Sequence, residues 1–281
     1  MMYPVTTPIK EQFIKVLNKP DHKVDLAYSA LLMSEYLNGP IKTKLYMGLL
    51  DDIAQTVRRE IDSAETATEI IECYNEYLFD ELKFIGNRNS YYNPGNSFFD
   101  KVLDARTGIP ISLSLLYLEV GWRLGLPVWG VGLPGHFIVA YGPQAEPIYI
   151  DVFNQGRILS EEDCLELCKV HPTQRQTFKT SFLKPIDKKS ILFRMLLNLK
   201  QIYVGLEDWE STYKTVDLMI AVRPNQTEEI RDRGLIAYRL NRLQAAIFDI
   251  ERYLFLTPDN TDEDWLNKHL EMMEEQLILL N

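Results

Sequence analysis

The sequence predicts an α+β protein with a helical N-terminal region, a mixed middle region and an all-α C-terminal third. Apolar residues recur at helical spacing from Pro8 to about Phe84, which predicts a series of helices. After Gly125 the apolar period becomes that of strands. From about Lys188 to Leu280 the helical spacing returns. A mixed domain followed by a helical one explains these changes.

Length and composition favour two folded domains. The chain has 281 residues, of which 46% are apolar and 25% charged, so it can bury a sizeable core. Its formal net charge of −10 argues against nucleic acid and membrane surfaces as partners. No signal peptide is visible, and no segment approaches the ~20 apolar residues of a membrane span. Together with only three cysteines, this predicts a cytoplasmic protein with reduced thiols.

The N-terminal region is predicted to form four helices. Their apolar positions are Phe13, Val16 and Leu17; Leu26, Ala30 and Leu31; Leu49, Ile53 and Val57; and Ile70, Cys73, Tyr74, Tyr77 and Leu78. Gly39 and Pro40 separate the second helix from the third, because glycine ends helices readily and proline cannot continue one. A polar stretch rich in turn residues follows, from Gly86 to Asn96.

A short helix from Ser97 to Arg106 and a longer one from Pro110 to about Leu124 are expected next. Proline suits the first position of a helix, since its missing N–H has no intrahelical partner there. The residues that follow Pro110 are apolar nearly all round. A helix of that kind lies inside a domain.

Three strands of an antiparallel meander are predicted to pack on this buried helix. They are Val128–Leu133, His136–Tyr141 and Pro147–Phe153. If the second hairpin turns around Gln144 and Ala145, His136 faces Asp151 to within about one residue of register. Both side chains then lie at one end of the sheet.

His136 and Asp151 suit the two supporting roles of thiol-dependent acyl transfer. In that chemistry a nucleophile at the start of a helix loses its proton to a histidine, which an acid holds in place. The start of the buried helix, however, contains no cysteine. The same histidine could instead be structural, bonded to Asp151 or to a backbone carbonyl.

A series of separated motifs runs through the chain: NPGNSF, GIPISLSLLYLEV, GVGLPGHF, YID, RMLLNLK and RDRGL. In content and order these motifs resemble the transglutaminase-like core of the SirB-type family, bacterial proteins in which tetratricopeptide repeats follow the core. The resemblance extends from about Ala27 to Pro258. It implies a papain-like α+β core at about residues 91–185, within a first domain of residues 1–187.

The C-terminal domain, residues 188–281, contains a repeat. Pro224 and Pro258 are 34 residues apart, as are Trp209 and Leu243. This period with a closing proline is typical of tetratricopeptide units, which stack into a helical patch. Such patches bind peptides through shape and a few polar contacts. A protein or peptide partner is therefore expected for this region.

The resemblance also shows what the chain lacks. The nucleophilic cysteine of true transglutaminases lies about fifteen residues before the glycine that ends the helix, a spacing that leads back here from Gly125 to Pro110. The nearest hydroxyls are Ser112 and Ser114. Ser114 lies one helical turn deeper than Pro110, and Ser112 lies on another face. This departure from the family pattern favours a pseudoenzyme.

Two functions are open at this point. The first is a non-catalytic, regulatory protein that binds a protein or peptide through its repeats and needs no cofactor. The alternative is a hydrolase or acyltransferase acting on peptide or amide bonds. In that enzyme Ser112 or Ser114 would be the nucleophile, His136 the base and Asp151 the residue that orients it.

Asn93, Asn96 and Arg106 are candidate binding residues near the expected mouth of the cleft. Arginine is the usual partner of a carboxylate. Alternatively, the asparagines make bonds within the turn and Arg106 caps carbonyls of the Ser97 helix. The sequence favours neither reading.

Cys164 and Cys168 lie one helical turn apart, with His171 three residues further on. This spacing could hold a metal ion, but a structural zinc site needs four ligands and a fourth is not apparent. Packing of the two thiols in the core is the better explanation. No metal site is predicted.

Overall fold

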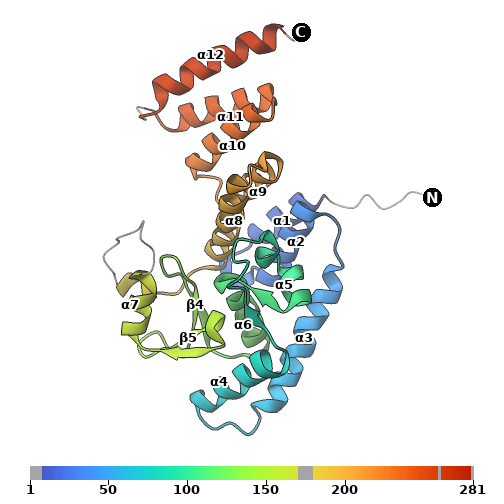
Figure 1. Ribbon diagram of the computed structural model, residues 1–281, viewed down its shortest axis with the longest axis vertical. Helices are drawn as coiled ribbons and strands as arrows, with labels where there is room; N and C mark the ends of the chain where they lie inside the picture. Colours follow the sequence, from blue (N-terminus) through green and yellow to red (C-terminus); the bar gives the residue numbers. More distant parts are fainter. Residues whose placement is uncertain (1–7, 170–179, 259–260, 280–281) are drawn as a thin grey trace, which may run out of the picture. The chain divides into compact units, whose positions relative to one another are not determined.

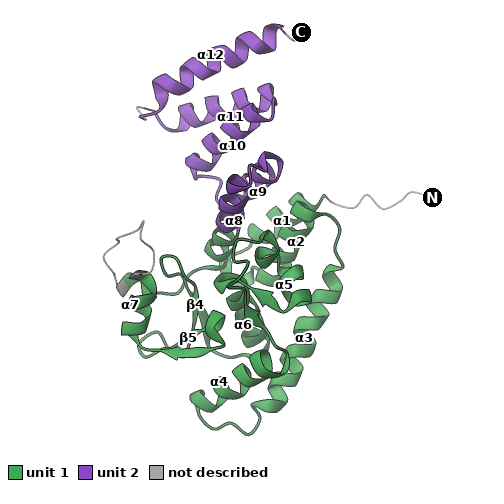
Figure 2. Ribbon diagram, in the orientation of Figure 1, with its two compact units in different colours: residues 1–195 green, residues 196–281 purple. Residues whose placement is uncertain are grey.

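The computed structural model describes residues 8–169, 180–258 and 261–279. The chain forms two compact units, residues 1–195 and 196–281 (Figure 2). Unit 1 combines helices with two small sheets, and unit 2 is helical throughout its described residues (Figure 1). The predicted α+β class is confirmed.

Unit 1 begins with the four helices that the apolar spacing predicts. They are α1 (Ile9–Leu17), α2 (Leu26–Asn38), α3 (Thr43–Glu60) and α4 (Ala67–Asn75). The Asp25 side chain caps α2, and Thr66 with Glu69 forms a capping box at the start of α4. Gly39, at φ +94°, ends α2 in a backbone conformation that favours glycine. A π-helical segment, Glu76–Glu81, continues α4 and was not predicted.

The centre of unit 1 is the buried helix α6, Pro110–Leu124. Every residue from Pro110 to Gly121 is buried. The helix packs against α2 and α3, and also against the strands β3 and β4 (Figure 1). It is preceded by α5 (Phe99–Ala105) and by a short parallel pair of strands, β1 (Ile85–Gly86) and β2 (Thr107–Gly108).

The larger sheet of unit 1 is antiparallel, in the order β3-β4-β5-β6. Its strands are β3 (Val128–Val131), β4 (Ile138–Tyr141), β5 (Ile148–Asp151) and β6 (Arg157–Leu159). The first three were predicted, although shorter than expected, and β6 was not. Val139 pairs with Ile150, which puts Asp151 level with Ile138. The expected register placed His136 opposite Asp151 to within about one residue. In the structure His136 instead lies two residues before β4.

The remaining part of unit 1 includes α7, Glu161–Lys169. Its two thiols, Cys164 and Cys168, are buried in an apolar cluster with Leu133 and Tyr149. Burial raises the pKa of the Cys164 thiol to about 12, so this thiol stays protonated at neutral pH. His171, considered as a third ligand beside them, lies outside the described residues.

Unit 2 contains the end of α8 (Lys188–Gly205), then α9 (Trp209–Val222), α10 (Thr227–Arg239), α11 (Leu243–Leu256) and α12 (Glu263–Leu279). Each helix from α9 to α12 packs on the next, as the tetratricopeptide prediction requires. A Cβ atom at Gly234 would lie 2.8 Å from the Ile250 side chain, so a small residue is needed where α10 crosses α11. Among the described residues, no helix is long and apolar enough to span a membrane.

Candidate functional site

The structure brings His136 and Asp151 together. The His136 Nε2 atom lies 3.1 Å from Asp151 Oδ1. The His136 side chain is 12% exposed and that of Asp151 is 1% exposed. A tight turn presents the histidine: Gly135 has φ +74°, and the His136 N–H donates to the Leu133 carbonyl. The side chains meet where this turn lies beside Asp151, the last residue of β5.

Asp151 is held as a carboxylate. Burial by itself raises the pKa of this carboxyl, but the hydrogen bonds from His136 and Asn154 outweigh burial, and the pKa lies below its usual value. Asn154 contributes two of these bonds, from its backbone N–H at 3.3 Å and from its side-chain amide at 2.6 Å. An ionised Asp151 fixes the orientation of the imidazole ring.

An aromatic wall lies beside His136. The Phe153 ring contacts the His136 ring edge-on, with 6.2 Å between centroids, and contacts Tyr91 at the same distance. The Arg88 guanidinium lies 5.4 Å above the Phe153 ring. A Cβ atom at Gly86 would come within 2.6 Å of Phe153, so the absence of a side chain at position 86 makes room for this ring.

Arg194, from α8, holds the turn that carries His136. Its Nη2 group donates to the backbone carbonyls of Leu133 and His136, at 2.8 and 2.9 Å. Its guanidinium carbon lies 5.5 Å above the Phe137 ring. Sequence analysis did not single out Arg194, which appeared only within the RMLLNLK motif. No local pattern links it to carbonyls about 60 residues away.

Ser112 makes three hydrogen-bond contacts to buried backbone, of which the longest joins its Oγ to the Ile109 carbonyl at 3.2 Å. Its Oγ donates to the Asn96 carbonyl at 2.6 Å and accepts from the Ile109 N–H at 3.0 Å. A Cβ atom at Gly108 would lie 2.7 Å from this Oγ, so glycine leaves the space that the hydroxyl fills. Ser112 thus joins the start of α6 to the preceding turn.

Ser114 is also fully buried, and within the described residues its Oγ has no hydrogen-bond partner. Throughout the described part of the chain, no hydrogen bond joins either candidate serine to His136, whose imidazole bonds only to Asp151. The structure therefore joins the candidate base to its orienting acid, and joins neither candidate nucleophile to the base.

The candidate asparagines make bonds within their own turn. The Asn93 side chain accepts from the Gly95 N–H at 2.8 Å. The buried Asn96 donates to the carbonyls of Ser90 and Tyr91, at 2.7 and 3.0 Å. These contacts match the turn-forming alternative considered from the sequence. They also fix the backbone beside Tyr91.

Arg106 is exposed and has a left-handed backbone, with φ +52°. Its Nη1 donates to the Leu82 carbonyl at 2.9 Å. The partner of Arg106 is therefore the end of the π-helical segment. One alternative from the sequence had Arg106 cap the helix that precedes it. The distance between Leu82 and Arg106 along the chain hides this contact from sequence reasoning.

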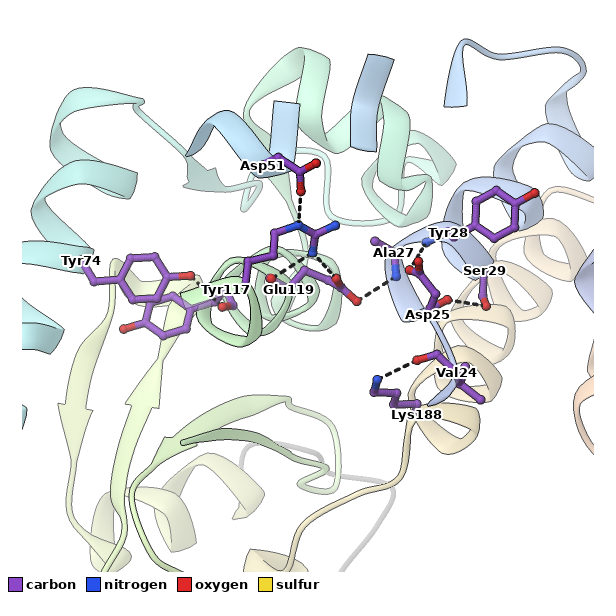
Figure 3. A network of polar contacts seen from close by, with 11 residues as sticks. Val24, Asp25, Ala27, Tyr28, Ser29, Asp51, Tyr74, Tyr117, Glu119 and Lys188 are labelled. Atoms are coloured by element: carbon purple, nitrogen blue, oxygen red, sulfur yellow. Dashed lines mark hydrogen bonds and ion pairs between the residues drawn. The ribbon is translucent and has the colours of Figure 1, made fainter. Parts of the chain in front are cut away.

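A second polar network, buried at Glu119 and exposed at Asp51, crosses α6 (Figure 3). The Glu119 carboxylate accepts from the Ala27 N–H at 2.9 Å and pairs with Arg123, whose Nε contacts Asp51 at 2.8 Å. Burial raises the pKa of Glu119, although the bonds from Arg123 and Ala27 oppose that effect. The network ties α2 and α3 to α6, which supports a structural role.

Comparison with protein families gives two matches. A model of the transglutaminase-like superfamily matches residues 44–197, and a model of the tetratricopeptide repeat matches residues 199–271. Together they cover most of the chain in the order that the sequence predicts.

Similar proteins include a UPF0162 protein of Xylella fastidiosa, 33% identical over 89% of this chain and 90% of its own length. A UPF0162 protein of Vibrio cholerae is 32% identical over 67% of this chain and 70% of its own length. Protein SirB1 of Salmonella typhimurium is 23% identical over 89% and 93% of the two chains.

Proposed function

The chain belongs to the UPF0162 family of transglutaminase-like proteins, and from that premise we propose that it is a non-catalytic binding protein. Its partner is a protein or peptide, taken through the repeat region of unit 2. One observation carries the proposal. The start of α6, where the fold family places its cysteine, holds Pro110, and neither nearby serine bonds to His136.

Chemistry at Ser112 would require its hydroxyl to leave the backbone groups that it contacts. The proton on Oγ is directed to the Asn96 carbonyl, and the oxygen accepts from Ile109. A nucleophilic serine instead needs a base within hydrogen-bond reach of its proton. The contacts of Ser112 are those of a residue that stabilises a helix start.

Unit 2 offers apolar contacts to a partner. Phe248 and Phe255 of α11 are 62% and 85% exposed, and Trp265 of α12 is 50% exposed. The two phenylalanines are seven residues apart, which places them on one face of α11. Exposed aromatic side chains of this kind mark interaction surfaces, so an amphipathic peptide is the expected class of partner.

Site-specific photocrosslinking tests the binding role. A benzoylphenylalanine placed at Phe255 in cells is expected to give a discrete crosslinked product. The same probe at Leu45 of α3, which is 62% exposed, serves as the control. A product of equal yield from both positions, or from neither, would contradict a binding role for unit 2.

The His136–Asp151 pair keeps an enzyme, a serine-dependent peptidase or acyltransferase, as the second candidate. A fluorophosphonate probe distinguishes the two. We expect no covalent labelling of the full-length protein. Labelling that disappears in both His136→Ala and Ser112→Ala, with the fold retained, would establish the enzyme instead.

A further inference from the structure

Arg194 is a partly buried cation that has no acidic partner within the part of the chain that the structure describes. No carboxylate lies within ion-pair distance of it among the described residues. The undescribed stretches of unit 1, residues 1–7 and 170–179, contain no Asp or Glu. Burial lowers the pKa of Arg194, and the nearby Tyr91 hydroxyl acts in the opposite direction. A desolvated charge without a counter-ion is costly, so a bound anion would stabilise it.

Some N–H donors of the Arg194 guanidinium are unused within the described residues. A guanidinium carries five N–H donors, and the Nη2 group of Arg194 uses its own on the Leu133 and His136 carbonyls. The Nε and Nη1 groups have no hydrogen-bond partner among the described residues, and neither counts as a buried unpaired atom. Both groups therefore keep some exposure to solvent and have unused donors.

Gly132 leaves space at one of these donors. A Cβ atom there would lie only 2.5 Å from the Arg194 Nη1 atom. Even the smallest side chain would crowd the guanidinium at its unused edge. Position 132 thus provides a way to obstruct Nη1 without removing the charge.

The surroundings of Arg194 suit an organic acid. The guanidinium binds the turn that carries His136, and Tyr91 lies close enough for its hydroxyl to interact electrostatically with the cation. Tyr91 and His136 both contact the Phe153 ring. A planar guanidinium matches a carboxylate with two parallel bonds, and aromatic rings pack against an apolar group or a peptide plane.

We propose that Arg194, together with His136 and the Tyr91–Phe153 wall, binds the C-terminal carboxylate of a peptide. The apolar side chain next to that carboxylate packs on the wall. This site lies in unit 1 and goes beyond the partner binding proposed for unit 2. Guanidinium recognition requires the ionised acid and discriminates against the uncharged amide.

Calorimetric titration of the full-length protein tests the proposal. The probe is N-acetyl-Gly-Phe with a free carboxylate, compared with the same dipeptide as its C-terminal amide. We expect the acid to bind at least tenfold more tightly than the amide. Equal affinities would overturn the proposal. N-acetyl-Gly-Glu amide distinguishes a side-chain carboxylate from a terminal one, and binding as tight as that of the free acid would contradict the terminal assignment.

Variants locate the site. Arg194→Gln is expected to weaken binding of the acid at least tenfold, whereas Arg58→Gln should leave it unchanged. Arg58 is a matched control, because it is an exposed arginine that also donates to a backbone carbonyl. Equal weakening in both variants would show a general charge effect and refute a site at Arg194.

Gly132→Ala decides the question if Arg194→Gln fails to fold. This variant keeps the charge and obstructs Nη1, so we expect loss of acid binding with an unchanged circular dichroism spectrum. Undiminished binding would overturn the proposal, as would displacement of the dipeptide by an equimolar amount of inorganic phosphate. A Phe255→Ala variant should still bind the acid. Failure of the unit 2 proposal and failure of this one are therefore distinguishable.

Discussion

Replacing Ser112 by alanine should destabilise unit 1 strongly. Ser112 is fully buried, and its Oγ pairs the Asn96 carbonyl and the Ile109 N–H. The change leaves two buried backbone groups unpaired, each at about 1–2 kcal/mol. We therefore expect a loss of about 2–4 kcal/mol in the free energy of unfolding.

Ser114, two residues along the same helix, provides the matched comparison. Its Oγ is buried without a partner among the described residues. Removing an unpaired hydroxyl relieves its desolvation, so Ser114→Ala should leave stability unchanged or raise it by about 1 kcal/mol. The same chemical change is thus expected to destabilise the protein at position 112 but not at position 114.

Urea unfolding followed by tryptophan fluorescence measures both effects. In a Trp209→Phe, Trp265→Phe background the signal comes from Trp122 and Trp129, which both lie in unit 1. With a slope of about 2 kcal/mol per M urea, Ser112→Ala should lower the midpoint by about 1–2 M. Equal losses in the two serine variants, or no loss in Ser112→Ala, would refute the reasoning from hydrogen bonds.

Three further outcomes are expected. The pKa of Glu119 is raised in the folded state. The wild type should therefore lose stability relative to Glu119→Gln as the pH rises above about 4.3, the pKa of a glutamate in the unfolded chain. Urea midpoints at pH 4 and pH 7 measure this difference. The pKa of Asp151 is lowered in the folded state, so its pH dependence has the opposite sign. Asp151→Asn should lower the free energy of unfolding most at pH 7, and this loss should shrink as the pH falls below about 3.9, the pKa of an unfolded aspartate. In unit 2, Arg233→Met leaves the buried Asp249 unpaired and should cost about 3–5 kcal/mol. Arg242→Met is the control. The Arg242 side chain is 40% exposed in its ion pair with Glu210, so this change should cost about 1 kcal/mol or less in thermal unfolding.

Both ends of helix α6 could be predicted closely because they have strong local signals. Pro110 starts it, and Gly125, at φ +75°, ends it in a left-handed conformation. Both effects act within one turn of the chain, where sequence is informative. The four N-terminal helices and the repeat period are predictable for the same reason, since apolar spacing is a local property.

The features that sequence reasoning missed depend on distant partners. Strand β6 has only three residues and exists through its pairing with β5. The position of His136 depends on the exact register of a turn. The alternation of apolar and polar residues does not determine that register. Arg194 acquires its role from carbonyls of Leu133 and His136 that lie on another element. Local patterns locate His136 and Asp151, but tertiary contacts bring Arg194 to the turn that carries His136.

The contact between Gly108 and Ser112 has an evolutionary consequence. Since the Ser112 hydroxyl occupies the space where a side chain at position 108 would begin, the two positions cannot vary independently. Relatives that keep serine at 112 should keep glycine at 108, and relatives that gain a side chain at 108 should have lost the hydroxyl. Such covariation would preserve this serine through selection for folding alone, with no catalytic demand on it.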